Sequence, residues 1–466
     1  MSERFDLVVV GAGPAGEKGG AQAAYFGKRV AIVDERPDPG GASTSHIGVV
    51  PTKALREAAL YLTGFRRREL YGLGLELTRD RLLERMHART TEVVGLSIGA
   101  VRRNLERHGM EFIVGRARLG PDRTVVVATA EGTRELQGDV LLLAPGSHPY
   151  HPPGMPFEDP DVHDSDSILE ISAIPSRLVV IGGGPIGCEY ASIFLALGAE
   201  VTLLDRGRRL LSFADAEISG ELAAALERRG MRFGWGLTVD RVERGEDGLA
   251  VAISDGRVLP ADAVLFAAGR AGTTEGLGLE EAGVRTDDRG RIVVDGEYRT
   301  SVAGVFAAGD VIGPPGLASA AMEQGRVAVG HAFGFPFKDT VDPLAPFGVY
   351  SVPEVGMVGM TEEEALGAGI DVETGRTPFE GNARARIAGD TEGLLKLVFR
   401  RDDRRLLGVH VVGDDATELV HVGQAVLHAN GTIDYFIHAT FNVPTRSEAY
   451  KYAAYDGLQR LSGHRL

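Results

Sequence analysis

The chain has 466 residues, of which 44% are hydrophobic and 25% charged, a balance typical of soluble globular proteins that excludes global disorder. At about 150 residues per domain it should form roughly three domains. Its net charge of −15 disfavours nucleic acid as a partner, and no apolar stretch approaches the roughly 18 residues that a membrane helix needs. We therefore expect neither a nucleic-acid partner nor a membrane partner.

The first elements of the chain predict a dinucleotide-binding βαβ unit. An apolar strand over residues 5–10 leads into a glycine-rich turn, a helix and a second apolar strand over residues 29–33. Such a turn lets the backbone approach a pyrophosphate at the helix N-terminus, and an acid about 20 residues further on can bind a ribose hydroxyl. Asp34 stands 23 residues after Gly11. The candidate cofactor-binding residues of this unit are Gly11, Gly13, Gly16, Asp34 and Glu35.

The same pattern recurs in the middle of the chain. A strand over residues 177–181, a glycine turn, a helix over 188–197 and a strand over 200–204 lead to Asp205, which stands 23 residues after Gly182. One glycine motif is weak evidence, but two copies with matching strands, helices and acids predict two bound dinucleotides. The candidate binding residues of this second unit are Gly182, Gly184, Ile186, Gly187, Asp205 and Arg206.

The rest of the chain predicts further elements and a third domain. Apolar residues near a 3.6-residue period indicate a long helix over residues 79–108. The tail from about residue 343 has no glycine motif and alternates strand-like with helical runs, which indicates an α+β domain. We therefore predict an α/β protein with two Rossmann-like domains, the first interrupted by the second, and a C-terminal α+β domain. The expected boundaries are 1–150 and 271–342 for the first domain, 151–270 for the second and 343–466 for the third.

The single cysteine, Cys188, limits the redox chemistry that the chain can carry. One thiol can neither close an intramolecular disulfide nor form a CxxC metal site, so we expect no metal site and a cytoplasmic location. We expect Cys188 itself to pack a helix against a sheet.

Several strings resemble the pyridine nucleotide–disulfide oxidoreductase family. Residues 300–310 resemble its second FAD motif, whose aspartate receives hydrogen bonds from the flavin ribityl chain. Residues 142–146 and 266–270 look like the paired crossings between the family's FAD and NAD(P) domains. The resemblance implies bound FAD, and a third domain that builds a homodimer or higher homo-oligomer. The further cofactor-binding residues that it implies are Gly146, Gly269 and Asp310.

Two segments depart from the family pattern. Residues 41–53 align with the redox-active segment, but Thr44 and Val49 stand where the family has two cysteines. Residues 441–448 resemble the family's His-Pro-Thr-x-Ser-Glu segment, with Val443 in place of the histidine base. With these losses the chain looks like the soluble pyridine nucleotide transhydrogenase branch. The strings that carry this second resemblance lie at residues 150–153, 164–169, 187–194, 317–321 and 441–460.

The missing dithiol decides the expected reaction. Without it, a reduced flavin must return its electrons to a pyridine nucleotide or to a diffusible acceptor, so a disulfide reductase is close to excluded. The resemblance implies an FAD-dependent transhydrogenase that passes hydride between NADPH and NAD⁺ through flavin N5 by a ping-pong mechanism, with NAD(H) and NADP(H) as substrates. An NAD(P)H:quinone oxidoreductase or diaphorase is the alternative. A redox-silent flavoprotein that senses NAD(P)H for a partner is an alternative of another class.

The resemblance also implies roles for individual side chains. The family lysine at the place of Lys53 lies near flavin N5 and pairs with a glutamate at the place of Glu189, so a cation there would favour the reduced flavin. An ordinary helix-terminal ion pair is the alternative. Ile186 falls where the family places a side chain over the empty nicotinamide pocket, although packing in the turn explains it nearly as well. His46 could line the far flavin face or be a polar loop residue, and we expect Glu448 to be a structural hydrogen-bond acceptor.

The loop after the second βαβ unit carries both signs of charge. Asp205 favours a free ribose 2′-OH, as in NAD, whereas Arg206, Arg208 and Arg209 could hold the 2′-phosphate of NADP. This combination suits an enzyme that accepts both nucleotides. It equally suits an NAD enzyme with a basic surface loop.

Overall fold

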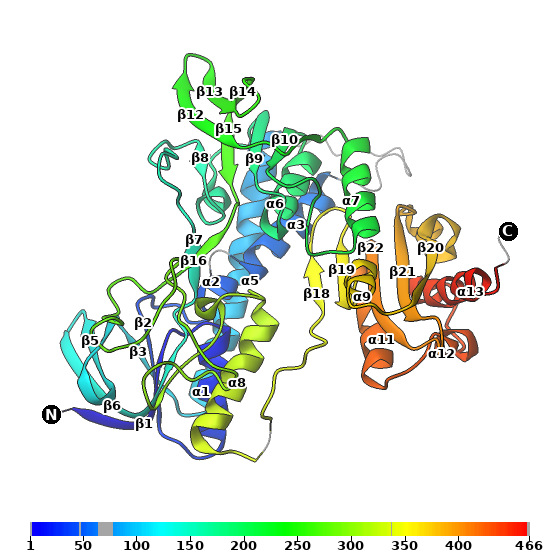
Figure 1. Ribbon diagram of the computed structural model, residues 1–466. Helices are drawn as coiled ribbons and strands as arrows, with labels where there is room; N and C mark the ends of the chain where they lie inside the picture. Colours follow the sequence, from blue (N-terminus) through cyan, green and yellow to red (C-terminus); the bar gives the residue numbers. More distant parts are fainter. Residues whose placement is uncertain (1, 46–47, 64–77, 337, 464–466) are drawn as a thin grey trace. The chain divides into compact units, whose positions relative to one another are not determined.

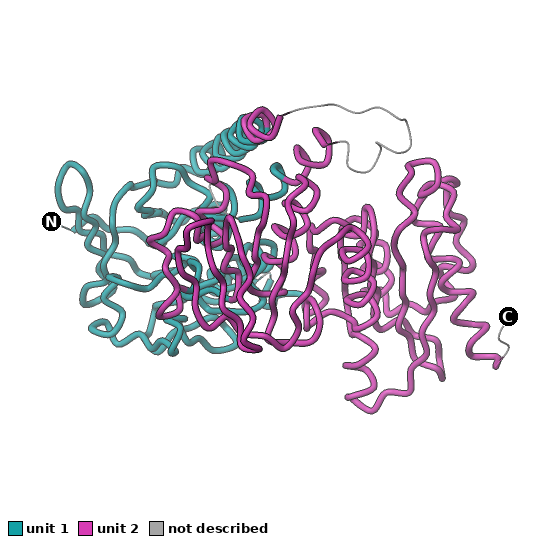
Figure 2. Tube along the Cα trace, turned by 90° about the horizontal axis from the view of Figure 1, so that it is seen from above, with its two compact units in different colours: residues 1–55, 86–150, 269–342 teal, residues 56–85, 151–268, 343–466 magenta. Residues whose placement is uncertain are grey.

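The computed structural model describes residues 2–45, 48–63, 78–336 and 338–463 (Figure 1). The chain forms two compact units, coloured separately in Figure 2. It passes from one unit to the other after Leu55, Arg85, Tyr150, Ala268 and Asp342. The predicted domain boundaries stay a prediction, because residues 151–268 share one unit with residues 343–466. The first unit contains residues 1–55, 86–150 and 269–342, and the second contains 56–85, 151–268 and 343–466.

The first unit contains the predicted first Rossmann-like sheet. Its strands lie in the order β3-β2-β1-β6-β5-β4, with β17 also paired to β6. The pairs among β1, β2, β3, β6 and β17 are parallel, whereas β4 and β5 add an antiparallel edge. The strands are β1 (Glu3–Val10), β2 (Val30–Asp34), β3 (Glu111–Val114), β4 (Arg116–Leu119), β5 (Thr124–Thr129), β6 (Gly132–Leu143) and β17 (Val305–Ala307).

Both faces of the central strands are buried, which explains the apolar runs in β1, β2 and the second half of β6. Leu7 and Val9 of β1 face one core cluster, to which helices α1 and α8 contribute. Val8 and Val10 face the opposite cluster. The helices are α1 (Pro14–Tyr25), α2 (Gly41–Ser45), α3 (Val49–Thr63), α5 (Arg79–Arg107) and α8 (Ala318–Phe333), of which α3 and α5 run across the boundary between the units. Helix α5 confirms the long helix predicted over residues 79–108.

Helices α1 and α8 approach each other very closely because glycines face each other across the contact. A Cβ at Gly325 would overlap the carbonyl oxygen of Ala15, and one at Gly19 would lie 2.9 Å from the carbonyl oxygen of Gly325. This contact places the N-terminal half of α8 beside the start of α1.

The second unit contains the predicted second Rossmann-like sheet. Its five parallel strands lie in the order β11-β10-β9-β15-β8, and helix α6 (Pro185–Ala196) follows β9. A small antiparallel sheet, β12-β13-β14, was not predicted. The strands are β8 (Val162–His163), β9 (Arg177–Ile181), β10 (Glu200–Asp205), β11 (Arg232–Trp235), β12 (Val239–Gly245), β13 (Gly248–Ile253), β14 (Val258–Ala261) and β15 (Ala263–Phe266).

The C-terminal part of this unit is the predicted α+β domain. An antiparallel sheet in the order β18-β19-β22-β21-β20 carries α11 (Ala416–His428) and α13 (Ala449–Leu461) on one face. The opposite face lies against α7 (Ala216–Arg228), which belongs to the second Rossmann-like fold (Figure 1). The strands are β18 (Phe347–Val349), β19 (Val355–Gly359), β20 (Val372–Pro378), β21 (Gly393–Arg400) and β22 (Leu406–Gly413), and the short helices are α9 (Glu362–Gly367), α10 (Ala383–Ala388) and α12 (Asp434–His438).

A buried lysine joins this domain to α7. Side chains alternate along β21, so Leu395 and Leu397 face the core beneath α11 and α13, while Lys396 faces α7. The Lys396 ammonium lies 2.9 Å from Asp215, 3.1 Å from Glu217 and 2.6 Å from Glu362. Burial opposes its charge, but the hydrogen bonds to the carboxylates of Glu362 and Asp215 outweigh burial and raise the pKa of Lys396.

Asp215 has a second role in the same contact. It is the residue that caps α7, and its carboxylate accepts hydrogen bonds from the backbone N–H groups of Glu217 (3.1 Å) and Ile218 (3.4 Å). Because the Asp215 side chain is fully buried, its charge is balanced by Lys396 and by the start of the helix rather than by water. One carboxylate therefore both starts α7 and ties it to the C-terminal sheet.

Replacing Lys396 with methionine should destabilise the protein by about 3–5 kcal/mol, because the buried charge of Asp215 loses its partner. The loss is measured as a lower urea midpoint by circular dichroism. The pKa of Lys396 is raised above the ordinary lysine value of about 10.4, so Lys396 is charged at both about pH 6 and about pH 8. The loss of stability should therefore be similar at these two pH values. Adding Asp215→Asn should restore part of the stability. The exposed pair of Arg404 and Asp434 supplies the control, and Arg404→Gln should cost less than about 1 kcal/mol.

Candidate functional site

The first glycine turn is closed by backbone contacts that only glycine permits. Gly11 has φ +102°, and a Cβ there would overlap the carbonyl oxygen of Ala144. A Cβ at Gly16 would overlap the carbonyl oxygen of Gly11. At Gly13, by contrast, a Cβ would meet no described atom nearer than the Cα of Gly41 at 3.9 Å. Among the described residues, the side of Gly13 at the N-terminus of α1 is therefore open, as a pyrophosphate site requires.

Asp34, at the end of β2, reaches back to this turn. Its carboxylate accepts hydrogen bonds from the backbone N–H groups of Ala12 (2.7 Å) and Arg36 (3.0 Å). Burial raises the pKa of Asp34. Each oxygen keeps a second lone pair, so the predicted bond to a ribose hydroxyl is compatible with these contacts and stays a prediction. Glu35 is exposed.

The second glycine turn repeats this construction in the other unit. Gly182 has φ +113°, and a Cβ there would lie 2.8 Å from the carbonyl oxygen of Ala267. A Cβ at Gly187 would overlap the carbonyl oxygen of Gly182, whereas one at Gly184 would meet no described atom within 4 Å. The open space again lies at the N-terminus of a helix, here α6, with Ile186 half-buried in its first turn.

Asp205 holds both ends of the second nucleotide loop. Its carboxylate accepts hydrogen bonds from the backbone N–H groups of Gly183 (2.6 Å) and Gly207 (2.5 Å). Replacing Asp205 would therefore disturb the loop itself as well as any contact with a ribose.

The three arginines after Asp205 differ in their surroundings. Arg209 donates a hydrogen bond to the carbonyl oxygen of Ser212 (2.6 Å) and lies 3.7 Å from Glu363. Arg206 and Arg208 are exposed and make no hydrogen bond or ion pair with another residue that the structure describes. They are thus the two guanidinium groups of this loop that are available to a ligand.

The two segments that follow the predicted crossings pair with each other in the first unit, and one of them contacts Asp310. Strand β7 (Ser147–Pro149) directly follows Gly146 and pairs antiparallel with β16 (Arg270–Gly272), which directly follows Gly269. The Asp310 carboxylate accepts a hydrogen bond from the Ser147 hydroxyl at 3.1 Å. Ser147 was not among the predicted site residues, although its position immediately after Gly146 was a usable signal.

Lys53 lies in α3, and Glu189 lies in α6, which corresponds to the helix predicted over residues 188–197. Glu189 is buried and accepts a hydrogen bond from the backbone N–H of Tyr350 at 2.9 Å. The pairing of Lys53 with Glu189 stays a prediction. One turn after Lys53, the buried Arg56 forms an ion pair with Glu354 at 3.0 Å, which anchors α3. Sequence reasoning did not single out Arg56.

The residues at the places of the redox groups carry no reactive thiol. Thr44 lies in α2 and Val49 begins α3, while His46 lies outside the described residues. Cys188 is fully buried within α6, as predicted, and its thiol lies 3.4 Å from the carbonyl oxygen of Gly183. Burial strongly raises the pKa of the Cys188 thiol, so it stays protonated and unreactive.

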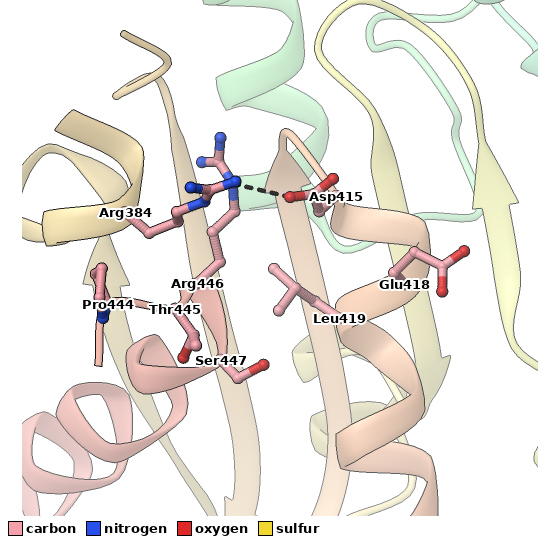
Figure 3. Close-up of a pocket in the computed structure, with 8 residues that line it drawn as sticks. All are labelled: Arg384, Asp415, Glu418, Leu419, Pro444, Thr445, Arg446 and Ser447. Carbon is pink, nitrogen blue, oxygen red and sulfur yellow. Dashed lines mark hydrogen bonds and ion pairs between the residues drawn. The ribbon is translucent and has the colours of Figure 1, made fainter. Parts of the chain in front are cut away.

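The segment that resembles the family's base-carrying segment forms a pocket in the C-terminal domain (Figure 3). Val443, at the place of the histidine, is 61% exposed. Arg446 is buried and donates a hydrogen bond to Asp415 at 3.1 Å, while Glu448 accepts one from the Tyr452 hydroxyl at 3.2 Å. These contacts fit a structural role for Glu448. The pocket is lined by Arg384, Asp415, Glu418, Leu419, Pro444, Thr445, Arg446 and Ser447.

Two further observations concern the described ranges as a whole. Every helix there is too short or too polar to cross a bilayer. No group of three or more histidine, cysteine, aspartate or glutamate side chains is arranged there to hold a metal ion.

Comparison with known proteins covers nearly the whole chain. The family model for pyridine nucleotide-disulphide oxidoreductases matches residues 5–325, and the model for that family's dimerisation domain matches residues 345–454. The soluble pyridine nucleotide transhydrogenase of Mycobacterium tuberculosis is 43% identical over 461 residues, covering 98% of each chain. The protein of the same name from Pseudomonas aeruginosa is 41% identical over 464 residues, covering 98% of this chain and 99% of its own.

Solved structures of similar chains share the fold. The Cu(II) complex of the HOCl-induced flavoprotein disulfide reductase RclA from Escherichia coli superposes with a TM-score of 0.88 at 28% identity, covering 98% of this chain and 99% of its own. LpdA from Mycobacterium tuberculosis also superposes with a TM-score of 0.88, at 27% identity, covering 97% of this chain and 99% of its own.

Two glycines of the second turn should respond differently to alanine. Gly184→Ala places a methyl group in the open space at the start of α6, so it should weaken NADH and NADPH binding by about 10-fold or more and leave stability unchanged. Gly187→Ala forces the helix away from the turn and should lower stability by about 1–3 kcal/mol. Nucleotide titration and thermal unfolding of both variants separate the effects. Equal loss of stability in the two variants would contradict the assignment of open space at Gly184.

Proposed function

Because the chain belongs to the pyridine nucleotide-disulphide oxidoreductase family, we propose that it is an FAD-dependent transhydrogenase that passes hydride between NADPH and NAD⁺ without a redox disulfide. One observation carries this proposal: the chain keeps both nucleotide folds but has a single, buried cysteine. With no second thiol, a disulfide acceptor within this chain is impossible. The relatives named soluble pyridine nucleotide transhydrogenase support the same reaction.

The first unit offers a site that fits FAD. Gly13 opens onto the space where a pyrophosphate would lie, and Asp34 and Asp310 supply acceptors for the ribose and ribityl hydroxyl groups. When bound, the flavin supplies the atom that accepts and returns hydride. The protein's part is to hold the cofactor, orient the nucleotide and supply charge.

The second unit offers the pyridine nucleotide site. Its open space at Gly184 faces the N-terminus of α6, whose N–H groups bind a pyrophosphate. NADPH and NAD⁺ would occupy this site in turn, as a ping-pong reaction requires. Ile186, half-buried in the first turn of α6, would cover the nicotinamide pocket when it is empty.

Lys53 and Glu189 complete the proposed site. The family resemblance supports a role for Lys53 as the positive charge beside the flavin, with Glu189 as its counter-ion. The match to the family's dimerisation domain shows that residues 345–454 carry that domain, and we extend it to a homodimer. The lone thiol further supports a cytoplasmic location.

The reaction is tested by anaerobic double mixing. NADPH should bleach the flavin absorbance, and thio-NAD⁺ added afterwards should restore it while thio-NADH forms in equal amount. Cys188→Ala should turn over at the wild-type rate, because the buried thiol takes no part.

Other outcomes would contradict the proposal. Recovery of the absorbance with a quinone but not with thio-NAD⁺ would assign the protein as a diaphorase. A single reduction without turnover would indicate a sensor of NAD(P)H. Loss of hydride transfer in correctly folded Cys188→Ala would overturn the thiol-free mechanism.

Arg206 and Arg208 should determine how tightly the protein binds NADP(H). Replacing Arg206 and Arg208 together with glutamine should weaken NADPH binding by about 10-fold or more at low salt and leave NADH binding unchanged, because an arginine–phosphate contact contributes about 1.5–3 kcal/mol. Arg209→Gln is the matched control and should have little effect on either nucleotide, since Arg209 already binds Ser212 and lies near Glu363. If the double variant binds NADPH as tightly as wild type, the loop is solvated surface and the dual use of nucleotides fails.

A further inference from the structure

In the first unit, the paired strands β7 and β16 carry a chain of hydrogen bonds that runs from Arg270 through Ser147 to Asp310. We call this chain of hydrogen bonds the relay. In the antiparallel pair of β7 with β16, Arg270 stands opposite Pro149, and its side chain reaches along the pair to Ser147. Its Nε donates to the Ser147 hydroxyl at 2.8 Å, and one terminal nitrogen donates to the Ser147 carbonyl oxygen at 2.7 Å. The Ser147 hydroxyl lies 3.1 Å from Oδ2 of Asp310.

The direction of these hydrogen bonds is fixed by the chemistry of the three groups. A guanidinium group has only donors, and an ionised carboxylate has only acceptors. The Ser147 hydroxyl must therefore accept from Arg270, and its single hydrogen points to Asp310. Reversing either bond would require Arg270 or Asp310 to take a role that it lacks.

The residue before Asp310 is held by a further hydrogen bond. Gly309, with φ +84°, donates its N–H to the side-chain oxygen of the buried Gln324 at 2.9 Å. Gln324 holds the backbone just before Asp310, and Ser147 holds one oxygen of the Asp310 carboxylate. Together these two hydrogen bonds restrict how the Asp310 carboxylate can turn.

We propose that Ser147 and Arg270 are positioning residues for FAD binding, which act by orienting the Asp310 carboxylate toward the ribityl hydroxyl groups. This inference rests on the proposed FAD site at Asp310 and adds two residues to it. A carboxylate already oriented loses less side-chain freedom when the cofactor binds, so the relay raises affinity without touching the cofactor. The positive charge of Arg270 also polarises the serine hydroxyl and strengthens its bond to Asp310.

The test measures the FAD dissociation constant of the apoprotein by flavin fluorescence. Ser147→Ala should weaken FAD binding by about 10-fold, the loss expected for a hydrogen bond to a charged group. Ser147→Thr keeps the hydroxyl in a strand position and should retain near wild-type affinity. Ser301→Ala is the matched control, because Ser301 is a hydrogen-bonded serine of the same unit whose partners are the backbone of Gly283 and Arg285.

A double-mutant cycle shows whether Ser147 acts through Asp310. Asp310→Ala alone should weaken FAD binding, and adding Ser147→Ala to it should weaken binding no further, because the carboxylate that the relay orients is already gone. The same absence of a further effect is expected for Arg270→Gln in the Asp310→Ala background. Thermal unfolding of each apoprotein reports any loss of folding separately from affinity.

These measurements distinguish failure of the relay from failure of the proposed FAD site. If wild type binds FAD and Asp310→Ala weakens binding but Ser147→Ala does not, the relay is overturned and the FAD site stands. Equal effects of Ser147→Ala in the wild-type and Asp310→Ala backgrounds would likewise show that Ser147 does not act through Asp310. If the wild-type apoprotein binds no FAD, the proposed function itself fails, and the relay with it.

Discussion

Both nucleotide folds depend on a backbone carbonyl group lying where a side chain would otherwise stand. At Gly16 and again at Gly187, the first turn of the helix rests directly on the carbonyl oxygen of the first glycine in the turn. This contact starts each helix so close to its strand that the free N–H groups point into open space at the middle glycine. The acid at the end of the next strand, Asp34 or Asp205, then reaches back to hold the turn. One steric requirement thus shapes both of the sites that we propose for nucleotides.

Local chemistry explains which parts of this architecture could be predicted. The two turns were identifiable because glycine spacing, apolar strands and a following acid all lie within about 25 residues of chain. Helix α5 was identifiable from its periodicity. The contact of Lys396 with Asp215 joins residues 181 positions apart. Because side chains alternate along β21, Lys396 points to the other face of the sheet from Leu395. Only the folded unit shows that α7 covers the face on which Lys396 lies.

The same limit applies to the site. Gly146, Gly269 and Asp310 were predicted from motifs, whereas Ser147 and Arg270 were not, because their role arises only when two strands 123 residues apart pair beside Asp310. The distinction among the loop arginines was equally hidden, since only the folded chain shows that Arg209 is already engaged. Residue type predicted the chemistry available, and tertiary pairing determined which side chains are free to use it.

The buried Lys396 has a consequence for protein engineering. It couples the second nucleotide fold to the C-terminal domain, because Lys396 of one is buried against Asp215 and Glu217 of the other. A chimera joined near residue 342 would combine Lys396 and Glu362 with a foreign helix in place of α7, or Asp215 and Glu217 with a foreign sheet that lacks the lysine. Grafting a new nucleotide specificity onto this scaffold therefore means conserving Asp215 and Glu217 on the donor fold, while the loop that starts at Arg206 remains open to exchange.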